Sequence, residues 1–251
     1  MLNLWELVFK GGWFMGPLLA CSIVGIGVVI ERFRYLNEVA VDNAGLRKKV
    51  ASLVRAGRLR QAVQLVESTP GPVAAIFDVA LRKLQFLVGL GKEPDQVEEG
   101  VIKSMEDHAI HVVADLERYL VVLATVINIA PMLGFLGTVS GMIGSFTVIS
   151  ESGMDPQKMA GGISEALITT ASGLVIAIPC QIAYNYFTNR VQRFVLDIEE
   201  SAAHFIEVLS GDFERIEKQV DDLHEESEAE EEEDEELAEE EHEEEEALAS
   251  T

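Results

Sequence analysis

The chain has 251 residues, 48% of them hydrophobic, and its formal net charge at pH 7 is −24. Residues 221–246 hold 19 Asp and Glu and no Lys or Arg, so the rest of the chain is only mildly acidic. No basic stripe with interleaved aromatic residues occurs, which argues against a nucleic-acid partner. The two cysteines lie inside apolar runs, where neither a disulfide framework nor a metal site is expected.

Three long apolar runs lie at residues 14–30, 119–149 and 165–187. Each reaches the roughly 17–25 residues that a membrane-spanning helix needs. None has Asp, Glu, Lys, Arg or His in its interior, because Glu165 stands at the edge of the third run. The first run continues nine residues past Cys21, which favours an uncleaved span over a signal peptide. The sequence therefore predicts an all-α integral membrane protein with three transmembrane helices.

The distribution of Lys and Arg predicts the orientation of these spans. Residues 31–118 hold 13 of the 19 basic residues, whereas the connection at 150–164 holds only Lys158. The positive-inside rule then places residues 31–118 and the C-terminal part in the cytoplasm. The short N-terminus, residues 1–13, and the connection at 150–164 are expected to be periplasmic. The predicted location is a bacterial inner membrane.

The segment at 31–118 is expected to form a small helical domain. Apolar residues at helical spacing predict one helix over 46–67, a second over 73–88, and a third that begins near Asp95 and runs into the second span. His108 and His111 are three residues apart on this third helix. Such a pair on a charged helix is more typical of solvated surface than of a metal site.

Beyond the third span, apolar residues continue at steps of three and four, which predicts an amphipathic cytoplasmic helix over 188–223. Residues 224–251 are low-complexity acid that cannot bury a core, and disorder is expected there. A solubilising tail is the simpler interpretation of this segment, and an electrostatic contact with a basic partner is the alternative.

Small and hydroxyl-bearing residues gather in the second and third spans. Four glycines at steps of three and four predict a close helix–helix approach on one face: Gly134, Gly137, Gly141 and Gly144, with Gly173, Pro131 and Pro179 as further packing positions. In an antiparallel hairpin, Thr138 and Thr170 fall within about 7 Å of one level. Such hydroxyls commonly bond to their own or a neighbouring helix, but a set of them in a charge-free zone also suits the lining of a pore. The candidate proton-path residues are Thr138, Thr170, Glu165, Ser145 and Thr169.

Two stretches resemble a known family. Residues 130–141, Ala-Pro-Met-Leu-Gly-Phe-Leu-Gly-Thr-Val-Ser-Gly, look like the second-span signature of the ExbB/TolQ/MotA proton-channel family. Residues 165–179, followed by Tyr184-Asn185, resemble its third span. Three spans fit the ExbB/TolQ branch better than MotA, which has four.

The resemblance implies a homopentamer around an ExbD- or TolR-like single-span subunit that supplies a membrane Asp, with a TonB- or TolA-like protein as a further partner. It also implies a ring-forming subunit of a motor in the lipid bilayer that uses protons to drive work at the periplasm or outer membrane. A passive membrane scaffold is the alternative. No nucleophile–base pair, nucleotide loop or cofactor motif occurs, so neither an enzyme nor a bound cofactor is expected.

Overall fold

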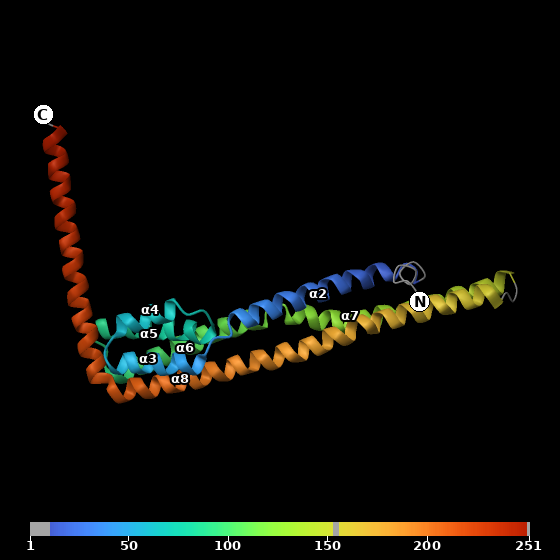
Figure 1. The fold of residues 1–251 in the computed structure, drawn as a ribbon, viewed down its shortest axis with the longest axis horizontal. Coiled ribbons are helices and arrows are strands. Elements are labelled where there is room, and N and C mark those ends of the chain that lie inside the picture. The colour runs from blue at the N-terminus through green and yellow to red at the C-terminus, as the bar shows by residue number, and fades with distance from the viewer. Residues whose placement is uncertain (1–10, 153–155, 250–251) are drawn as a thin grey trace. The chain divides into compact units, whose positions relative to one another are not determined.

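The computed structural model describes residues 11–152 and 156–249 (Figure 1). Side chains are described up to residue 213, except at positions 151, 152, 156, 158 and 212. Every regular element in this part of the chain is an α-helix, which confirms the predicted fold class. The helices are α2 (Met15–Glu38), α3 (Asn43–Arg55), α4 (Leu59–Glu67), α5 (Pro72–Gly89), α6 (Pro94–Glu117), α7 (Leu120–Ser152) and α8 (Pro156–Ala249).

Three stretches of the described helices are long and apolar enough to cross a membrane, as the sequence predicts: Met15–Arg55, Pro94–Ser150 and Met159–Gly211. Their large apolar side chains face outward to an extent unusual for a soluble protein. Ile23 is 72% exposed, Phe135 68% and Val175 70%. Side chains of this kind are stable against lipid tails and unfavourable in water. The chain is a multi-pass membrane protein.

The connection between the second and third spans is shorter than expected. The sequence suggests an irregular segment over 150–164, but α7 continues to Ser152 and α8 begins at Pro156, which leaves only residues 153–155 outside the described structure. Proline suits the first turn of a helix, because its missing N–H has no partner to lose there. The polar residues of this segment therefore extend the two helices instead of separating them.

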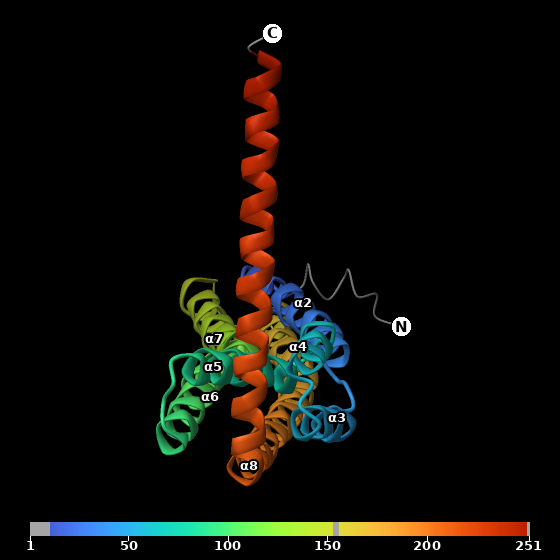
Figure 2. The same cartoon turned by 90° about the vertical axis from the view of Figure 1, so that its left-hand side faces the viewer.

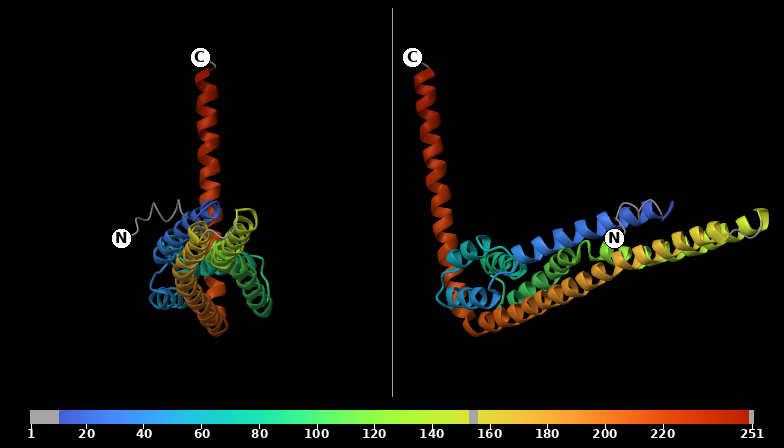
Figure 3. Two further views of the ribbon diagram at one scale, coloured as in Figure 1. Left: turned by 90° about the vertical axis from the view of Figure 1, so that its right-hand side faces the viewer. Right: turned by 45° about the vertical axis from the view of Figure 1, so that its right-hand side comes forward.

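The chain divides into two compact units, and α8 contributes to both. The first, here called the membrane unit, comprises Met1–Glu38 and Val113–Arg193. In it, α2, α7 and the first part of α8 run beside one another (Figure 3). Gly25 of α2 lies against Val126 of α7 and Cys180 of α8, where a Cβ would approach the Cys180 Sγ to 2.9 Å. The three spans thus meet through a small residue.

The second unit comprises Val39–Val112 and Phe194–Thr251, and it holds α3 to α5, most of α6 and the rest of α8 (Figure 2). Its core is one cluster of buried apolar side chains from all of these helices. Phe77 of α5 and Phe205 of α8 contact each other at the centre, with ring centroids 5.7 Å apart. On its surface, Arg82 donates to both Asp78 and Glu67, and the Asp78 carboxylate raises the pKa of this guanidinium.

The predicted helix over 46–67 is two helices, α3 and α4. The chain breaks at Gly57, whose φ of +74° is a left-handed conformation that side chains disfavour. The Gly57 and Arg58 amides bond back to the Val54 and Leu53 carbonyls, 3.0 and 2.8 Å away, and so close the end of α3. The apolar pattern continues across this turn, which is why periodicity alone does not reveal it.

A second break separates α6 from α7, where the sequence suggests one helix. Tyr119 has φ +65° and is the one non-glycine residue with a positive φ in the described part of the chain. For a bulky residue this conformation is strained and needs support from its surroundings.

Arg32 of α2 provides that support. Its side chain is buried, and its Nη1 donates to the Asp115 and Leu116 carbonyls at 3.3 and 3.2 Å, in the last turn of α6. Its Nε and Nη2 donate to Glu31, and its guanidinium lies over the rings of Tyr35 and Tyr119, 4.7 and 5.1 Å from their centroids. A guanidinium can cap carbonyls and stack on rings at once because it is planar. Arg32 therefore fixes the junction between α6 and α7 to α2.

Through the acidic segment, α8 continues as a helix to Ala249. Glu, Ala and Leu have high helix propensity, and neither Gly nor Pro occurs after Gly211. Repulsion between acids three and four residues apart opposes that propensity.

Candidate functional site

Glycines bring α7 and α8 into backbone contact in the membrane unit. A Cβ on Gly134 would lie 3.0 Å from the Thr170 Cα, and one on Gly173 would lie 2.6 Å from the Ala130 carbonyl oxygen. A Cβ on Gly141 would lie 2.9 Å from both the Ala166 Cβ and the Gly162 carbonyl oxygen. In lipid, where burial of apolar surface drives little association, such close backbone approach holds helices together.

The predicted packing positions do not all contribute. Gly137 meets the side chain of Thr169, but nothing lies within 4 Å of a Cβ placed on Gly144. Gly144 therefore lies outside the α7–α8 contact within this chain. Pro131 and Pro179 lie inside α7 and α8, and Pro179 is exposed.

Two of the candidate hydroxyls join separate parts of the chain. The Thr170 hydroxyl donates across the helix pair to the Gly134 carbonyl, at 2.9 Å. The Thr169 hydroxyl is buried and lies 2.8 Å from the Glu165 carbonyl of its own helix and 3.2 Å from the Gly11 carbonyl before α2. These two threonines fix α8 to α7 and to the segment that leads into α2.

The other two candidate hydroxyls bond within their own helix. The Thr138 hydroxyl donates to the Phe135 carbonyl at 2.6 Å, and the Ser145 hydroxyl donates to the Gly141 carbonyl at 3.0 Å. Ser145 is buried, whereas Thr138 is half-buried at the edge of the α7–α8 contact. The own-helix bonding expected of a single hydroxyl therefore applies to both, and it leaves their oxygens able to accept a further bond.

The relative depth of Thr138 and Thr170 agrees with the sequence estimate. Gly134 lies opposite Thr170, so Thr138 is four residues, or about 6 Å, further along α7 toward its C-terminal end. This is close to the distance of about 7 Å expected from the antiparallel hairpin.

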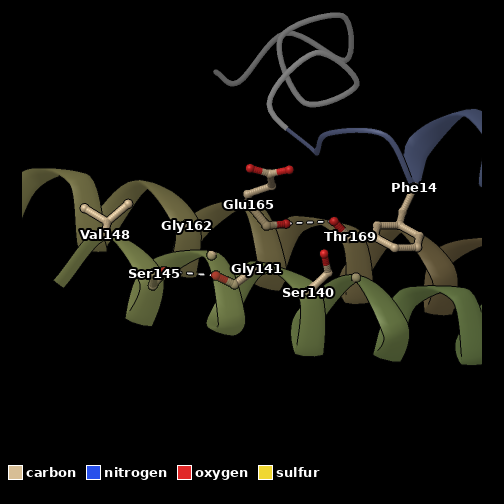
Figure 4. A pocket seen from close by; sticks show the side chains of 10 residues that line it. Phe14, Ser140, Gly141, Ser145, Val148, Gly162, Glu165 and Thr169 are labelled. Atoms are coloured by element: carbon tan, nitrogen blue, oxygen red, sulfur yellow. Dashed lines mark hydrogen bonds between the residues drawn. The ribbon is translucent and has the colours of Figure 1, made fainter. Parts of the chain in front are cut away.

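A cavity of about 300 Å³ lies between α7 and α8 beyond this level (Figure 4). Glu165, Thr169 and Ser145 line it, so the structure brings together three of the five candidate path residues, and Thr138 and Thr170 lie outside it. The other lining residues are small or apolar: Phe14, Gly137, Ser140, Gly141, Gly144, Val148 and Gly162. A space lined by the three hydroxyl-bearing residues Ser140, Ser145 and Thr169, with Glu165 at its rim, can bind water or a small cation.

Glu165 stands at the rim of this cavity, and its carboxylate points away from α7 in Figure 4. A side chain on Gly12 would collide with the Glu165 carboxylate, and Gly12 itself has φ +65°. Only glycine therefore fits this position without strain. The segment before α2 lies directly against the acid of α8.

Sequence reasoning missed Gly12, Phe14, Ser140 and Gly162 as parts of this site. Gly162 contacts Ser145, and its glycine pair with Gly161, three residues before Glu165, was a signal for close approach. Gly12 and Phe14 precede the first span, and their link to α8 depends on long-range packing that no local pattern encodes.

Comparison with known proteins matches the sequence of this chain to a family. Residues 69–200 match the MotA/TolQ/ExbB proton channel family. The chain belongs to this family. It is 31% identical over 195 residues to a biopolymer transport protein ExbB homolog from Methanothermobacter thermautotrophicus. The match covers 77% of this chain and 66% of that protein, just under two thirds of its length.

Two further relatives support the ExbB/TolQ branch of the MotA/TolQ/ExbB family. TolQ of the Tol-Pal system of Haemophilus influenzae is 28% identical over 192 residues, 76% of this chain and 82% of that protein. The biopolymer transport protein ExbB of Neisseria meningitidis is 28% identical over 196 residues, 76% of this chain and 87% of that protein. The matched range 69–200 contains every candidate path and packing residue, whereas α2, α3, α4 and the acidic segment lie outside it.

Proposed function

We propose that this chain is the ring-forming channel subunit of an inner-membrane motor, in which the proton motive force drives work at the periplasm or outer membrane. The observation that carries the proposal is the hydroxyl set on the facing sides of α7 and α8, in a zone of the spans that has no Asp, Glu, Lys, Arg or His. Polar side chains inside a membrane are costly, and a stripe of them commonly marks a transport path. The family membership supports the same role.

The path needs a proton carrier that this chain does not supply at its centre. Threonine and serine do not titrate near neutral pH. Glu165 lies next to Ala166, which packs on Gly141, so it is displaced from Thr138 and Thr170 toward the C-terminal end of α7. We therefore assign the carrier to an ExbD- or TolR-like single-span partner with a membrane Asp, enclosed by a ring of copies of this chain. Thr138 and Thr170 would solvate that carboxylate as it alternates between charged and neutral forms.

The direction of work follows from the proposed orientation. The Lys and Arg residues at 31–118 favour a cytoplasmic second unit, with the N-terminus and the α7–α8 connection in the periplasm. Glu165 then faces the periplasmic mouth, where protons enter. Each proton that moves down 100 mV releases about 2.3 kcal/mol, so several are needed for one mechanical step.

The test is proton flux in vesicles that hold the chain with and without its single-span partner. Thr138→Val and Thr170→Val keep the side-chain shape and remove the hydroxyl. We expect each variant to assemble with the partner and to lose most of the partner-dependent flux. Equal flux with and without the partner, unchanged by either substitution, would show that the path and the carrier lie elsewhere.

A passive scaffold is the second candidate, and one observation favours it: Thr138 and Ser145 bond back to their own helix, as hydroxyls with only a packing role do. In that case neither valine substitution changes proton movement in any assembly. The same vesicle measurement therefore separates the two functions.

A further inference from the structure

The second unit carries opposite charges on different helices. Residues 43–66, in α3 and α4, contain six Lys and Arg and no Asp or Glu. The part of α6 in this unit, residues 94–112, and the part of α8 at 194–211 together contain nine Asp and Glu and one Lys. Basic residues are thus concentrated on α3 and α4, and acidic residues on α6 and α8.

The basic face belongs to α3, which packs on one flank of α8. The Asn43 side chain donates to Asp197 at 2.7 Å, and Arg47 pairs with Glu200 at 2.9 Å. These successive contacts show that α3 runs parallel to α8. Because a helix turns about 100° per residue, Lys48 and Lys49 point away from α8, and both are exposed.

The acidic face lies on the opposite flank of α8, between α8 and α6. Figure 2 shows α3 and α6 on the two sides of α8. A groove of about 400 Å³ runs along this flank, with an apolar floor that includes Met105, Ile198 and Ile206. Glu106 of α6 and Glu199 of α8 line the groove, and both are exposed.

The two faces lie at the same level along α8. The groove spans positions 198–206 of α8, and the contacts of Asn43 and Arg47 place Lys48 and Lys49 beside the same stretch. Copies related by pure rotation meet at equal height, and contacts between two different faces then close into a ring when the rotation per copy divides a full turn. A level difference would instead produce an open helical assembly.

We propose that the Lys48–Lys49 face of one copy docks on the Glu106–Glu199 groove of the next copy, so that the second unit forms its own ring of contacts. The aliphatic stems of the two lysines cover the apolar floor, and their ammonium groups reach the carboxylates. A single exposed ion pair contributes little, but a network repeated at every interface accumulates. The proposal rests on the proposed ring and names the surfaces that close it outside the membrane.

Charge reversal tests this docking in the full chain, with ring size read by native mass spectrometry in mild detergent. Lys48→Glu with Lys49→Glu should lower the fraction of intact rings at least fivefold, and Glu106→Lys with Glu199→Lys should do the same. The four substitutions together should restore most of the rings, because opposite charges face each other again. Lys92→Glu changes the net charge by the same amount as Lys48→Glu alone. It is therefore the matched control, and it should leave the fraction of intact rings unchanged.

Cysteine pairing gives a second, direct measurement. In a background with Cys21→Ala and Cys180→Ala, the pair Lys49→Cys and Glu199→Cys should form a ladder of disulfide-linked species that ends at the ring size. The pair Lys92→Cys and Glu199→Cys should remain monomeric on a denaturing gel. No ladder from the first pair, in rings that are otherwise intact, would overturn the proposal.

The remaining outcomes separate this interface from its alternatives. If the lysine reversals leave the rings unchanged but reduce binding to vesicles of anionic lipid, the basic face binds a membrane surface and the docking proposal fails. If truncation after Leu223 mimics the lysine reversals, the acidic segment occupies the basic face and the proposal also fails. If the unmodified chain forms no rings, the proposed function itself fails.

Discussion

The two halves of α8 pack by different physics within one helix. In the membrane unit, α8 meets α7 through Gly173 and the backbone around Thr170, while its large apolar side chains, such as Val175, face outward. In the second unit, α8 turns Ile198, Phe205 and Leu209 into a closed apolar core and leaves Glu199 and Glu200 exposed. Large apolar side chains of α8 therefore face outward in the membrane unit and inward in the second unit.

The difference follows from the solvent on each half. Water drives apolar side chains together, so the second unit gains stability from buried area. Lipid tails are as apolar as leucine, so the membrane half gains stability from close backbone approach and hydrogen bonds between helices. Deletions of bulk should therefore damage the second unit, and additions of bulk should damage the membrane unit.

The largest effect is expected from Phe205→Ala in the second unit. This change removes the ring that contacts Phe77 and leaves a cavity in the core, at a cost of about 3–5 kcal/mol. Leu196→Ala is the control on the same helix, because Leu196 is 63% exposed, and it should change stability by less than about 0.5 kcal/mol. Denaturant unfolding of the purified chain in detergent measures both variants, and similar losses would contradict the assignment of the core.

Arg32→Met tests the junction that connects the membrane helices to α6. The substitution leaves the Asp115 and Leu116 carbonyls without their partner and removes support from the positive φ of Tyr119. A loss of roughly 2–4 kcal/mol is expected in the same unfolding measurement, because buried acceptors become unsatisfied.

Arg34→Met is the matched control, since Arg34 is two residues away on α2 and exposed. Amide hydrogen exchange at residues 115–122 should accelerate in the Arg32 variant and stay unchanged in the control. Unchanged exchange in both would mean that α2 does not hold the junction.

These two tests also mark what the sequence could and could not predict. The three spans, the glycine contact at Gly134, Gly137 and Gly141, and the level of Thr138 against Thr170 follow from composition and helical spacing, which are local properties. The break at Tyr119 does not, because its cause is Arg32, more than eighty residues away in the chain. The contact of Gly12 with Glu165 and the cavity beside it also depend on how distant segments pack.

Adding one methyl group to the glycine face should be costly at one position and harmless at another. In Gly173→Ala the new Cβ would lie 2.6 Å from the Ala130 carbonyl oxygen, so the two backbones must separate, at about 1–3 kcal/mol. Gly144→Ala meets nothing within 4 Å and should be neutral or stabilising by up to about 1 kcal/mol, because alanine favours a helix over glycine. Equal effects of the two changes on unfolding in detergent would refute the described α7–α8 contact.

The smallest effect separates packing from transport. Thr170→Val removes the hydrogen bond to the Gly134 carbonyl between helices, and such bonds contribute about 0.6 kcal/mol on average in membranes. Thr138→Val removes only a bond to the Phe135 carbonyl of its own helix, so its effect on stability should be close to zero. Unfolding in detergent should resolve Thr170→Val from the unmodified chain and leave Thr138→Val superimposed on it. A loss of proton flux in a Thr138→Val ring of normal stability then has no explanation in assembly and must come from the path itself. If Thr138→Val instead destabilises the chain more than Thr170→Val does, Thr138 is a packing residue, and the flux experiment cannot assign it to the path.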